Sequence, residues 1–298
     1  MVIPTLNAGH RWQACLAGVA KQTLSLQRRL VVDSASTDDT VSLAEHAGFE
    51  VKRIRRSEFN HGGTRQWAAE YLDNCDILVF LTQDAILESS ESLMNIARCF
   101  NDPRVAVAYG RQFPHQGAKP MEAHARQFNY GDTDQRKDLA ACAALGAKVF
   151  FCSNSFAAYR RSLLLRLGGF RKDLILGEDM EFAARAVKAG FVNVYSASAT
   201  ASHSHDYSLL EQFRRYFDIG VFDARNKWMR EDFGSHRGEG LRFVKSELRY
   251  LRTAAPLQIP RAMLHTGAKL LGHQLGLREE SVPLWAKKRM SMSRGYWG

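Results

Sequence analysis

The first part of the chain alternates between short apolar runs and longer segments whose apolar residues recur every three or four positions. Short apolar runs bounded by polar residues are typical of buried strands. They predict strands at Val2–Leu6, Arg29–Val32, Val51–Ile54 and Ile77–Leu81. The segments between them predict helices at His10–Thr23, Thr40–Gly48 and Arg65–Asn74. Strands separated by such helices predict βαβ units, and so an α/β fold whose central sheet is mostly parallel and flanked by helices.

The second part of the chain is less regular. Further strands are predicted at Val105–Tyr109, Val149–Cys152 and Val192–Ser196, and further helices at Arg160–Leu167 and Asp179–Ala189. The polar segment Pro114–Arg136 is predicted to be a loop region facing a substrate. After Tyr207 the pattern turns helical to about Met229, and Leu241–Leu277 predicts helices broken at Pro256 and Pro260. We therefore predict a main α/β domain over residues 1–222 and a basic helical extension over residues 223–298.

Polar side chains follow the predicted strands of the first part at the point where each strand ends. They are Asn7, Asp33, the loop at Asn60 and Asp84. In open α/β sheets, ligands bind beyond the carboxyl ends of the strands. The sequence therefore predicts a ligand site along this edge. Asp84 needs a partner in particular, because it ends an apolar strand and an unpaired buried carboxylate is costly.

Composition narrows the class of protein. The chain has 298 residues, ordinary hydrophobic and charged fractions, and five scattered cysteines without a CxxC pair, which favours reduced thiols over disulfides or zinc. Neither a signal peptide nor an apolar stretch of transmembrane length is recognisable, so a cytoplasmic location is expected. The formal net charge is +10, and the residues from Asp206 onward carry seventeen Lys and Arg against ten Asp and Glu. An anionic membrane surface is one candidate partner of that part, and a solvated basic surface is the alternative.

Six motifs, in this order, resemble the inverting glycosyltransferases of family 2, which have the Rossmann-like GT-A fold. They are VIPTLN, VVDSASTDDT, FNHGGTRQ, LTQDA, GGF…GEDMEFAARAVKAG and SHSHDY. The FNHGGTR block and the TQDA ending resemble the bacterial rhamnosyltransferase branch in particular. This resemblance implies a dTDP-L-rhamnose donor and an acceptor in lipopolysaccharide or another surface polysaccharide. It spans about Met1 to Phe222 and leaves the C-terminal part without a recognised motif.

Asp84 is the predicted metal ligand. A divalent cation, Mg²⁺ or Mn²⁺, neutralises the charge that builds on a departing nucleoside diphosphate, and it is commonly held by one or two carboxylates plus phosphates. Many family 2 enzymes carry a DxD-type motif here, whereas this chain has Gln83-Asp84-Ala85 with a single acid. The alternative is that Asp84 caps a helix starting near Ile86.

The resemblance also places the nucleoside. Asp33 faces the pyrimidine, whose N3–H a carboxylate can accept, and Asp38 supports the loop. Pro4, Thr5 and Asn7 line the other side of the base. Thymine and uracil share this edge, so a UDP-hexose donor stays an alternative. Turn and capping bonds within this segment are the structural alternative.

The block Asn60-His61-Gly62-Gly63-Thr64-Arg65 is a glycine-rich loop entering a helix. Glycines permit close backbone approach to a ligand, and a helix N-terminus favours an anion. Arg65 is a candidate for the diphosphate, and Asn60 and His61 are candidates for sugar hydroxyls. We include Gln83 and Gly62 among the residues predicted to bind the nucleotide sugar.

Glu178 and Asp179 precede the helix MEFAARAVKAG. Inverting transfer needs one base to take the proton of the acceptor hydroxyl as its oxygen attacks the anomeric carbon. By resemblance Asp179 is that base, and Glu178 holds the acceptor or orients the loop. The alternative for the pair is helix capping with an acidic first turn.

His203 and His205 lie two residues apart, so on an extended strand they face the same way. The resemblance favours contact with metal or diphosphate, and we assign His203 to the metal and His205 to the phosphate. Arg215, in a basic and aromatic helix, is a further phosphate candidate.

The predicted function is sugar transfer to a hydroxyl of a glycolipid or oligosaccharide acceptor, in the cytoplasm or at the inner face of its membrane. A nucleotidyltransferase would also use acids on an α/β sheet, but the basic glycine-rich N-terminal signature of such enzymes is missing. A basic membrane-binding or nucleic-acid-binding protein without catalysis would explain the charge but not the ordered acids. No nucleic-acid partner is expected.

Overall fold

The computed structural model describes residues 1–234 and 238–298. Its chain divides into two compact units. Unit 1 comprises residues 1–113, 130–172 and 178–203, and unit 2 comprises residues 114–129, 173–177 and 204–298. The boundary predicted at Phe222 falls inside a helix, Leu209–Arg225.

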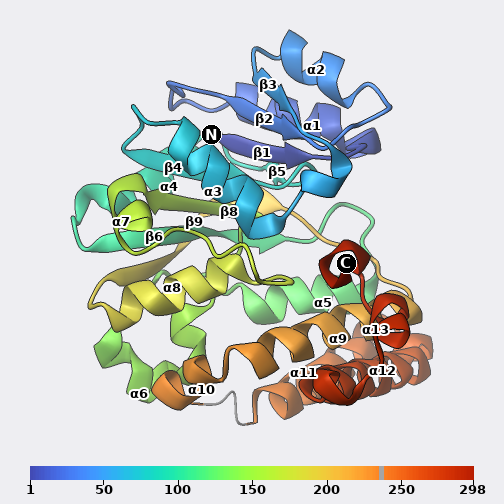
Figure 1. The fold of residues 1–298 in the computed structure, drawn as a ribbon. Coiled ribbons are helices and arrows are strands. Elements are labelled where there is room, and N and C mark those ends of the chain that lie inside the picture. Colours follow the sequence, from blue (N-terminus) through green and yellow to red (C-terminus); the bar gives the residue numbers. More distant parts are fainter. Residues whose placement is uncertain (235–237) are drawn as a thin grey trace. The chain divides into compact units, whose positions relative to one another are not determined.

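Unit 1 is built on a mixed sheet (Figure 1). Its strands are β1 Val2–Thr5, β2 Leu30–Asp33, β3 Glu50–Arg53, β4 Ile77–Leu81, β5 Ile86–Leu87, β6 Val105–Phe113, β7 Gln135–Lys137, β8 Phe156–Arg160 and β9 Val192–Ser202. The order is β3-β2-β1-β4-β8-β6-β9-β5, and β7 also pairs with β9. The predicted parallel arrangement is confirmed for β3, β2, β1 and β4. Beyond them β8 is antiparallel to both β4 and β6, which makes the whole sheet mixed.

Helices cover both faces of this sheet. They are α1 Trp12–Ala20, α2 Thr40–His46, α3 His61–Tyr71, α4 Ser92–Arg98, α6 Cys142–Leu145, α7 Arg161–Arg166 and α8 Glu178–Lys188. Alternate residues of β4 serve opposite faces, as a strand requires. Val79 and Leu81 join a core with Trp12 of α1. Phe80 instead packs edge-on against Tyr159 and Phe170 on the other face.

Two sequence predictions in the middle of the chain are wrong. Val149–Cys152 is not a strand, because residues Gly146–Phe150 form a 3-10 helix whose end is held by the Asn193 side chain. Such short apolar runs do not distinguish a strand from a buried helical turn. Pro114–Arg136 is not a loop, because it contains helix α5, Pro120–Asn129.

The sequence pattern did not predict helix α5, because the residue that this helix buries is a histidine, His124. His124 is buried, contacts the rings of Phe243 and Tyr250, and shares a hydrogen bond with Ser246. A polar residue at the core position conceals the helical period of apolar residues.

Unit 2 is helical. Besides α5 it contains α9 Leu209–Arg225, α10 Lys227–Phe233, α11 Glu239–Ala254, α12 Ile259–Leu277 and α13 Leu284–Met290. The predicted break at Pro256 is confirmed by a 3-10 turn, Pro256–Gln258, between α11 and α12. Pro260 instead lies in the first turn of α12, where its missing N–H costs nothing. Among the described residues, no helix has the length and apolar character needed to cross a bilayer.

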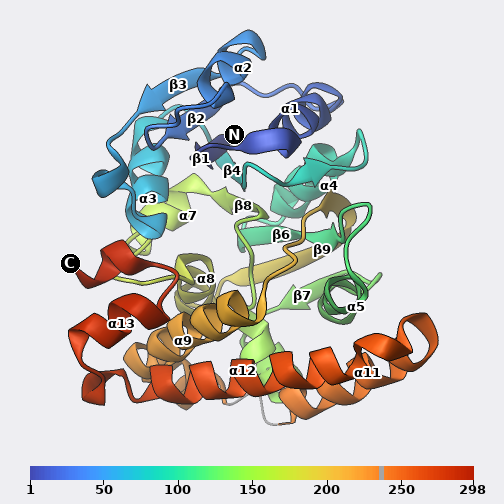
Figure 2. The ribbon, with the colours of Figure 1, turned by 90° about the vertical axis from the view of Figure 1, so that its right-hand side faces the viewer.

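Helices α9 and α12 pack side by side with very close backbones (Figure 2). A Cβ atom on Gly272 would lie 2.3 Å from the carbonyl oxygen of Phe213, and one on Gly276 would lie 2.1 Å from that of Phe217. On the facing helix, a Cβ on Gly220 would lie 2.3 Å from the carbonyl oxygen of His273. Glycine is therefore required on both sides of this contact.

Candidate active site

The loop after β2, helix α2 and the end of β3 border a groove of about 510 Å³. Asp33 and Asp38 line it, with Thr37 between them. Asp33 is 1% exposed and accepts hydrogen bonds from Thr5 Oγ1 at 3.0 Å and from the Ser36 N–H at 2.9 Å. Burial by itself would raise the pKa of Asp38, but hydrogen bonds from Thr40 and Gly9 hold that pKa below its usual value. The groove has the polar carboxylate edge that a nucleoside needs.

Side chains join the loops at the carboxyl ends of β1, β2 and β4. The Gln83 amide accepts from the Leu6 N–H at 2.7 Å and donates to the Leu6 carbonyl at 3.1 Å. Asn7 Oδ1 accepts from the Thr37 N–H at 2.8 Å. Asn7 and Ala35 are the non-glycine residues of the described chain with positive φ, 43° and 66°. Such backbone strain is typical of ligand-binding loops that the surrounding structure holds in place. Pro4, which was also predicted to line the base, is half-buried in β1.

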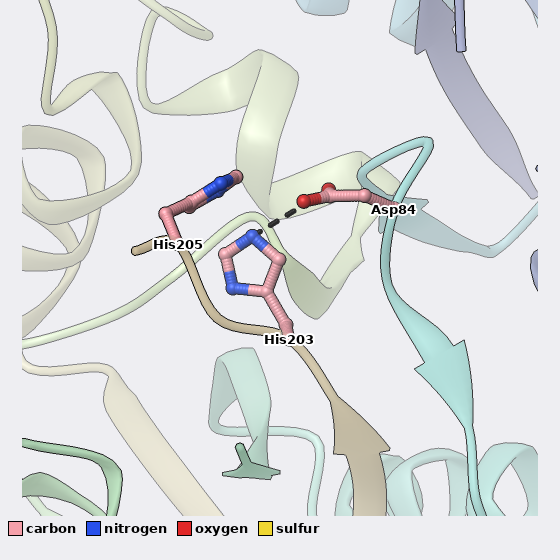
Figure 3. A group of neighbouring side chains, drawn as sticks. All are labelled: Asp84, His203 and His205. Atoms are coloured by element: carbon pink, nitrogen blue, oxygen red, sulfur yellow. Dashed lines mark ion pairs between the residues drawn. The ribbon is translucent and has the colours of Figure 1, made fainter. Parts of the chain in front are cut away.

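Asp84 faces His203 across the junction of β5 and β9 (Figure 3). Ile86 pairs with Ser202, and this register brings the residues just outside the two strands together. One carboxylate oxygen of Asp84 lies 3.5 Å from Nε2 of His203. The helix-cap alternative for Asp84 is wrong, because the element that begins at Ile86 is strand β5.

His205 lies two residues after His203, on the stretch of chain that leaves β9. Single ligand atoms of Asp84, His203 and His205 lie within 4.8 Å of one another (Figure 3). One carboxylate and two imidazoles form a donor set that suits a divalent transition metal. The sequence assigned His205 to phosphate, and the geometry makes it a candidate metal ligand as well.

Gln112 sets the tautomer of His203. Its amide nitrogen donates to Ser153 Oγ at 3.0 Å, so its oxygen faces Nδ1 of His203, also at 3.0 Å. An acceptor oxygen at that place favours a proton on Nδ1, and Nε2, which faces Asp84, is then the nitrogen that could bind a metal. A hydrogen bond of this kind orients a metal-binding histidine and raises its basicity.

Glu178 and Asp179 begin α8, and Asn154 contacts both acids. Its backbone N–H donates to Asp179 Oδ2 at 2.8 Å, and its side-chain amide donates to Glu178 Oε1 at 2.9 Å. The same Glu178 oxygen accepts from Arg65 at 2.9 Å, in an ion pair whose side chains are each 6% exposed. Glu178 is thus occupied by protein groups, whereas Asp179 is only half-buried.

The two neighbouring carboxylates differ in pKa. Burial opposes ionisation of Glu178, but the charges of Arg65 and His61 and the bond from Asn154 outweigh it and lower its pKa. Burial, followed by the charge of Glu178, raises the pKa of Asp179 to about 6. A pair of acids whose environments separate their pKa values is typical of acid–base catalysis.

The glycine-rich block has a structural use that the sequence did not reveal. Asn60 caps α3 by accepting from the Gly63 N–H at 2.7 Å, while His61 is exposed and packs against Phe59. A Cβ on Gly62 would lie 1.8 Å from the Arg171 carbonyl oxygen, so this glycine permits packing of the protein against itself. Arg65, expected at the diphosphate, is buried against Glu178.

In unit 2, His205 stacks on Tyr207 with ring centroids 5.2 Å apart, and the Arg215 guanidinium lies 5.6 Å from the Tyr207 ring centroid. His205 also borders a small hollow lined by Lys119, Arg261, His265 and Lys269. His265 is 4% exposed, and its Nδ1 lacks a hydrogen-bond partner. Burial and these three cations lower the pKa of His265. Three acids, Glu122, Asp206 and Glu247, share this lining with the three cations, so the hollow is polar and of mixed charge.

Sequence reasoning missed Gln112 and Asn154 of unit 1 and, separately, the hollow of unit 2. Gln112 lies near the end of β6 and Asn154 in a short Ser-Asn-Ser turn, so neither has a charge or spacing that marks it.

Two comparisons with known proteins bear on this site. The sequence model named Glycosyl transferase family 2 matches residues 1–168. The chain is 46% identical over its whole length to "O-antigen chain rhamnosyltransferase RfbN" of Salmonella typhimurium, covering 95% of that protein. It is 47% identical, with the same coverage of both chains, to "O-antigen chain rhamnosyltransferase WbaN" of Salmonella anatum.

Solved structures support the fold. A mannosyltransferase from Pyrobaculum calidifontis, in complex with GDP-Man and Mn²⁺, has a TM-score of 0.58 at 19% identity. That alignment covers 99% of this chain and 83% of the other. TarS of S. aureus in complex with UDP-GlcNAc has a TM-score of 0.54 at 15% identity, over 94% of this chain and 90% of its own. At these identities the likeness shows the fold alone, which is of the GT-A type.

Proposed function

Because the chain belongs to glycosyl transferase family 2, we propose that it transfers L-rhamnose from dTDP-L-rhamnose to a glycan in O-antigen synthesis. The observation that carries the proposal is whole-chain identity of 46% to a rhamnosyltransferase, together with a site containing separated acids and a carboxylate–imidazole group.

In this proposal the donor occupies the groove bordered by the loop after β2, helix α2 and the end of β3. Asp33, Ser36 and Asp38 provide the polar wall for the pyrimidine and ribose. A thymine N3–H is the matching donor for a carboxylate oxygen. The positive φ values of Asn7 and Ala35 support a loop shaped for a ligand, since that strain has to be held by the surrounding structure.

Asp84, His203 and His205 are the proposed holders of a divalent cation. The fit rests on the donor set, because Nε2 of His203 faces Asp84 while Gln112 contacts Nδ1. Mg²⁺ prefers oxygen ligands alone, whereas imidazole nitrogen suits transition metals, so Mn²⁺ is favoured over Mg²⁺. When bound, the ion supplies positive charge that stabilises the departing nucleoside diphosphate.

Asp179 is the proposed base. Its oxygen takes the proton of an acceptor hydroxyl while that hydroxyl oxygen bonds to the anomeric carbon of rhamnose. The bond from that carbon to the phosphate oxygen breaks, and its electron pair leaves with dTDP, which inverts the anomeric centre. Burial, followed by the charge of Glu178, which Arg65 fixes in place, holds the pKa of Asp179 near the working pH. Glu178 is thus a positioning residue here.

The acceptor is proposed to be a glycan on a lipid carrier, reached by a peripherally bound enzyme at the membrane surface. The small hollow beside His205, with Lys269 among its polar lining residues, is a candidate for a hydroxylated part of that glycan. Lys269→Met should then raise the KM for the acceptor several-fold and leave the donor affinity unchanged. Unchanged acceptor KM would exclude the hollow.

The alternatives of another class are not favoured. A nucleotidyltransferase or a non-catalytic basic protein has no use for a separated acid pair in a family 2 domain. A UDP-hexose donor remains the rival within the family.

Calorimetry with a panel of donors tests the proposal. In the presence of Mn²⁺, dTDP-L-rhamnose should bind at least ten times more tightly than UDP-glucose, UDP-galactose or UDP-N-acetylglucosamine. Asp33→Asn should weaken this binding. The control Lys21→Gln, at the exposed residue that directly follows α1, should leave it unchanged. Preferential binding of a UDP-sugar would reject rhamnose and keep the reaction class.

A further inference from the structure

Helix α12 exposes an apolar face. Its exposed positions recur at helical spacing, and they include Met263, Leu264, Leu270 and Leu271, which are 50%, 64%, 63% and 57% exposed. Leu257, in the turn that precedes the helix, is 95% exposed. A surface helix normally directs such a stripe into the core. Here the inward face instead uses Gly272 and Gly276, which leaves the leucines on the outside.

Helix α11, which precedes that turn, exposes a basic face. Arg242, Lys245, Arg249 and Arg252 are all exposed and recur at three- and four-residue spacing. Between Leu241 and Arg278 the chain carries seven Lys and Arg residues and a single acid, Glu247. Glu247 is 3% exposed, so the outer surface of this segment is apolar and cationic.

We propose that α11 and α12 form a docking surface for an anionic lipid bilayer. The leucines of α12 and Leu257 enter the boundary between headgroups and acyl chains, and the cations of α11 contact lipid phosphates. Helices with these two properties lie in the membrane interface and do not span it. The inference deepens the proposed function, because a lipid-borne acceptor would be presented at that surface.

Charge decides between a bilayer and a second copy of the chain. A symmetric dimer through this surface would bring together two cationic fringes, for which the described residues 241–278 offer a single acid, the buried Glu247. Anionic lipid phosphates complement the same fringe. Leu257, at 95% exposure in a turn, is also placed as an insertion point at the end of the helix.

Vesicle sedimentation tests this surface with purified full-length protein. The wild type should bind vesicles of phosphatidylcholine containing about 30% phosphatidylglycerol, and bind pure phosphatidylcholine at least tenfold more weakly. Leu264→Gln with Leu271→Gln, and separately Lys245→Gln with Arg249→Gln and Arg252→Gln, should each lower binding to anionic vesicles at least tenfold.

Matched controls change the same residue types elsewhere. Leu139→Gln, at a side chain 51% exposed in unit 1, and the triple change Lys21→Gln, Arg56→Gln and Arg98→Gln should bind like the wild type. Equal binding by the α12 and α11 variants, or equal loss in the controls, would overturn the proposal. The proposal would also be overturned if light scattering showed that the wild type is a dimer and that the leucine changes convert it to a monomer.

Activity separates this inference from the proposed function. With acceptor dispersed in detergent, the leucine variant should transfer rhamnose as fast as the wild type. Selective vesicle binding by a protein that transfers no rhamnose would reject the proposed function and keep the docking surface. Rhamnose transfer by a protein that does not bind vesicles would reject the docking surface and keep the proposed function.

Discussion

The backbone N–H of Asn154 donates a 2.8 Å hydrogen bond to the Asp179 carboxylate, which ties the proposed base to the turn before β8. The Asn154 side chain reaches Glu178 at the same time. One residue therefore fixes the spacing of both acids. Its own amide oxygen accepts from the Tyr159 hydroxyl at 2.8 Å, so the sheet core orients the amide.

The pKa of Asp179, about 6, sets a pH dependence. A base acts in its ionised form, so kcat/KM should be constant above pH 7 and fall about tenfold per pH unit below 6. A pH–rate profile at saturating Mn²⁺ measures this. An acid limb below pH 4.5 would contradict the raised pKa.

Glu178→Gln should move that limb to lower pH. The change removes the negative charge that helps to raise the pKa of Asp179, so the base stays ionised in more acid solution. It also leaves Arg65 buried without its partner, which costs about 3–5 kcal/mol of stability. Thermal unfolding of the variant should therefore be followed together with its pH–rate profile. A limb that stays near pH 6 would show that Glu178 does not set the pKa.

Asp179→Asn should lower kcat by a factor of about 10²–10⁴ with little change in donor affinity, because it removes the base and keeps the shape. Donor calorimetry provides the control for folding and binding. Weaker donor binding with an unchanged kcat would instead place Asp179 at the nucleotide sugar.

Gln112→Ala should weaken the metal site through His203. Loss of the acceptor at Nδ1 frees the ring to rotate and to protonate at Nε2, and such losses typically cost 10–100-fold in metal affinity. The Mn²⁺ concentration for half-maximal activity should rise by that factor, and excess Mn²⁺ should restore the rate. A rate that falls without rescue by Mn²⁺ would point to a purely structural role.

Gly276→Ala should destabilise unit 2. The added Cβ would lie 2.1 Å from the Phe217 carbonyl oxygen, and overpacking of this kind typically costs about 1–3 kcal/mol. Gly267→Ala on the same helix meets nothing within 4 Å and should raise stability by about 0.5–1 kcal/mol through helix propensity. Denaturant unfolding of both variants measures the contrast. Equal effects would mean that the close helix contact is not formed.

The sequence predicted the elements whose apolar period is strong. Strand β4 was located to the residue, because five apolar residues lie between polar ones. Strand β8 was missed, since Phe156–Arg160 runs directly into a helix without a turn residue between them. Antiparallel pairing of β8 inside the sheet follows from long-range contacts that no local pattern encodes.

For the site, charged residues at strand ends were identifiable and their partners were not. Asp84 and His203 were both singled out, and the β5–β9 register that joins them became evident only in the fold. Arg65 was expected at the diphosphate because cationic residues near glycine loops bind phosphate. Its ion pair with Glu178, 113 positions away in the sequence, forms only in the tertiary structure.

Incorporation of labelled rhamnose from dTDP-L-rhamnose into lipid-extractable glycan, with acceptor-bearing membranes and Mn²⁺, tests the central claim most directly. We predict incorporation by the wild type that EDTA abolishes and Asp84→Asn reduces at least a hundredfold. Leu139→Gln should transfer like the wild type. Incorporation from a UDP-sugar in place of dTDP-L-rhamnose, or incorporation that EDTA and Asp84→Asn leave unchanged, would contradict the claim.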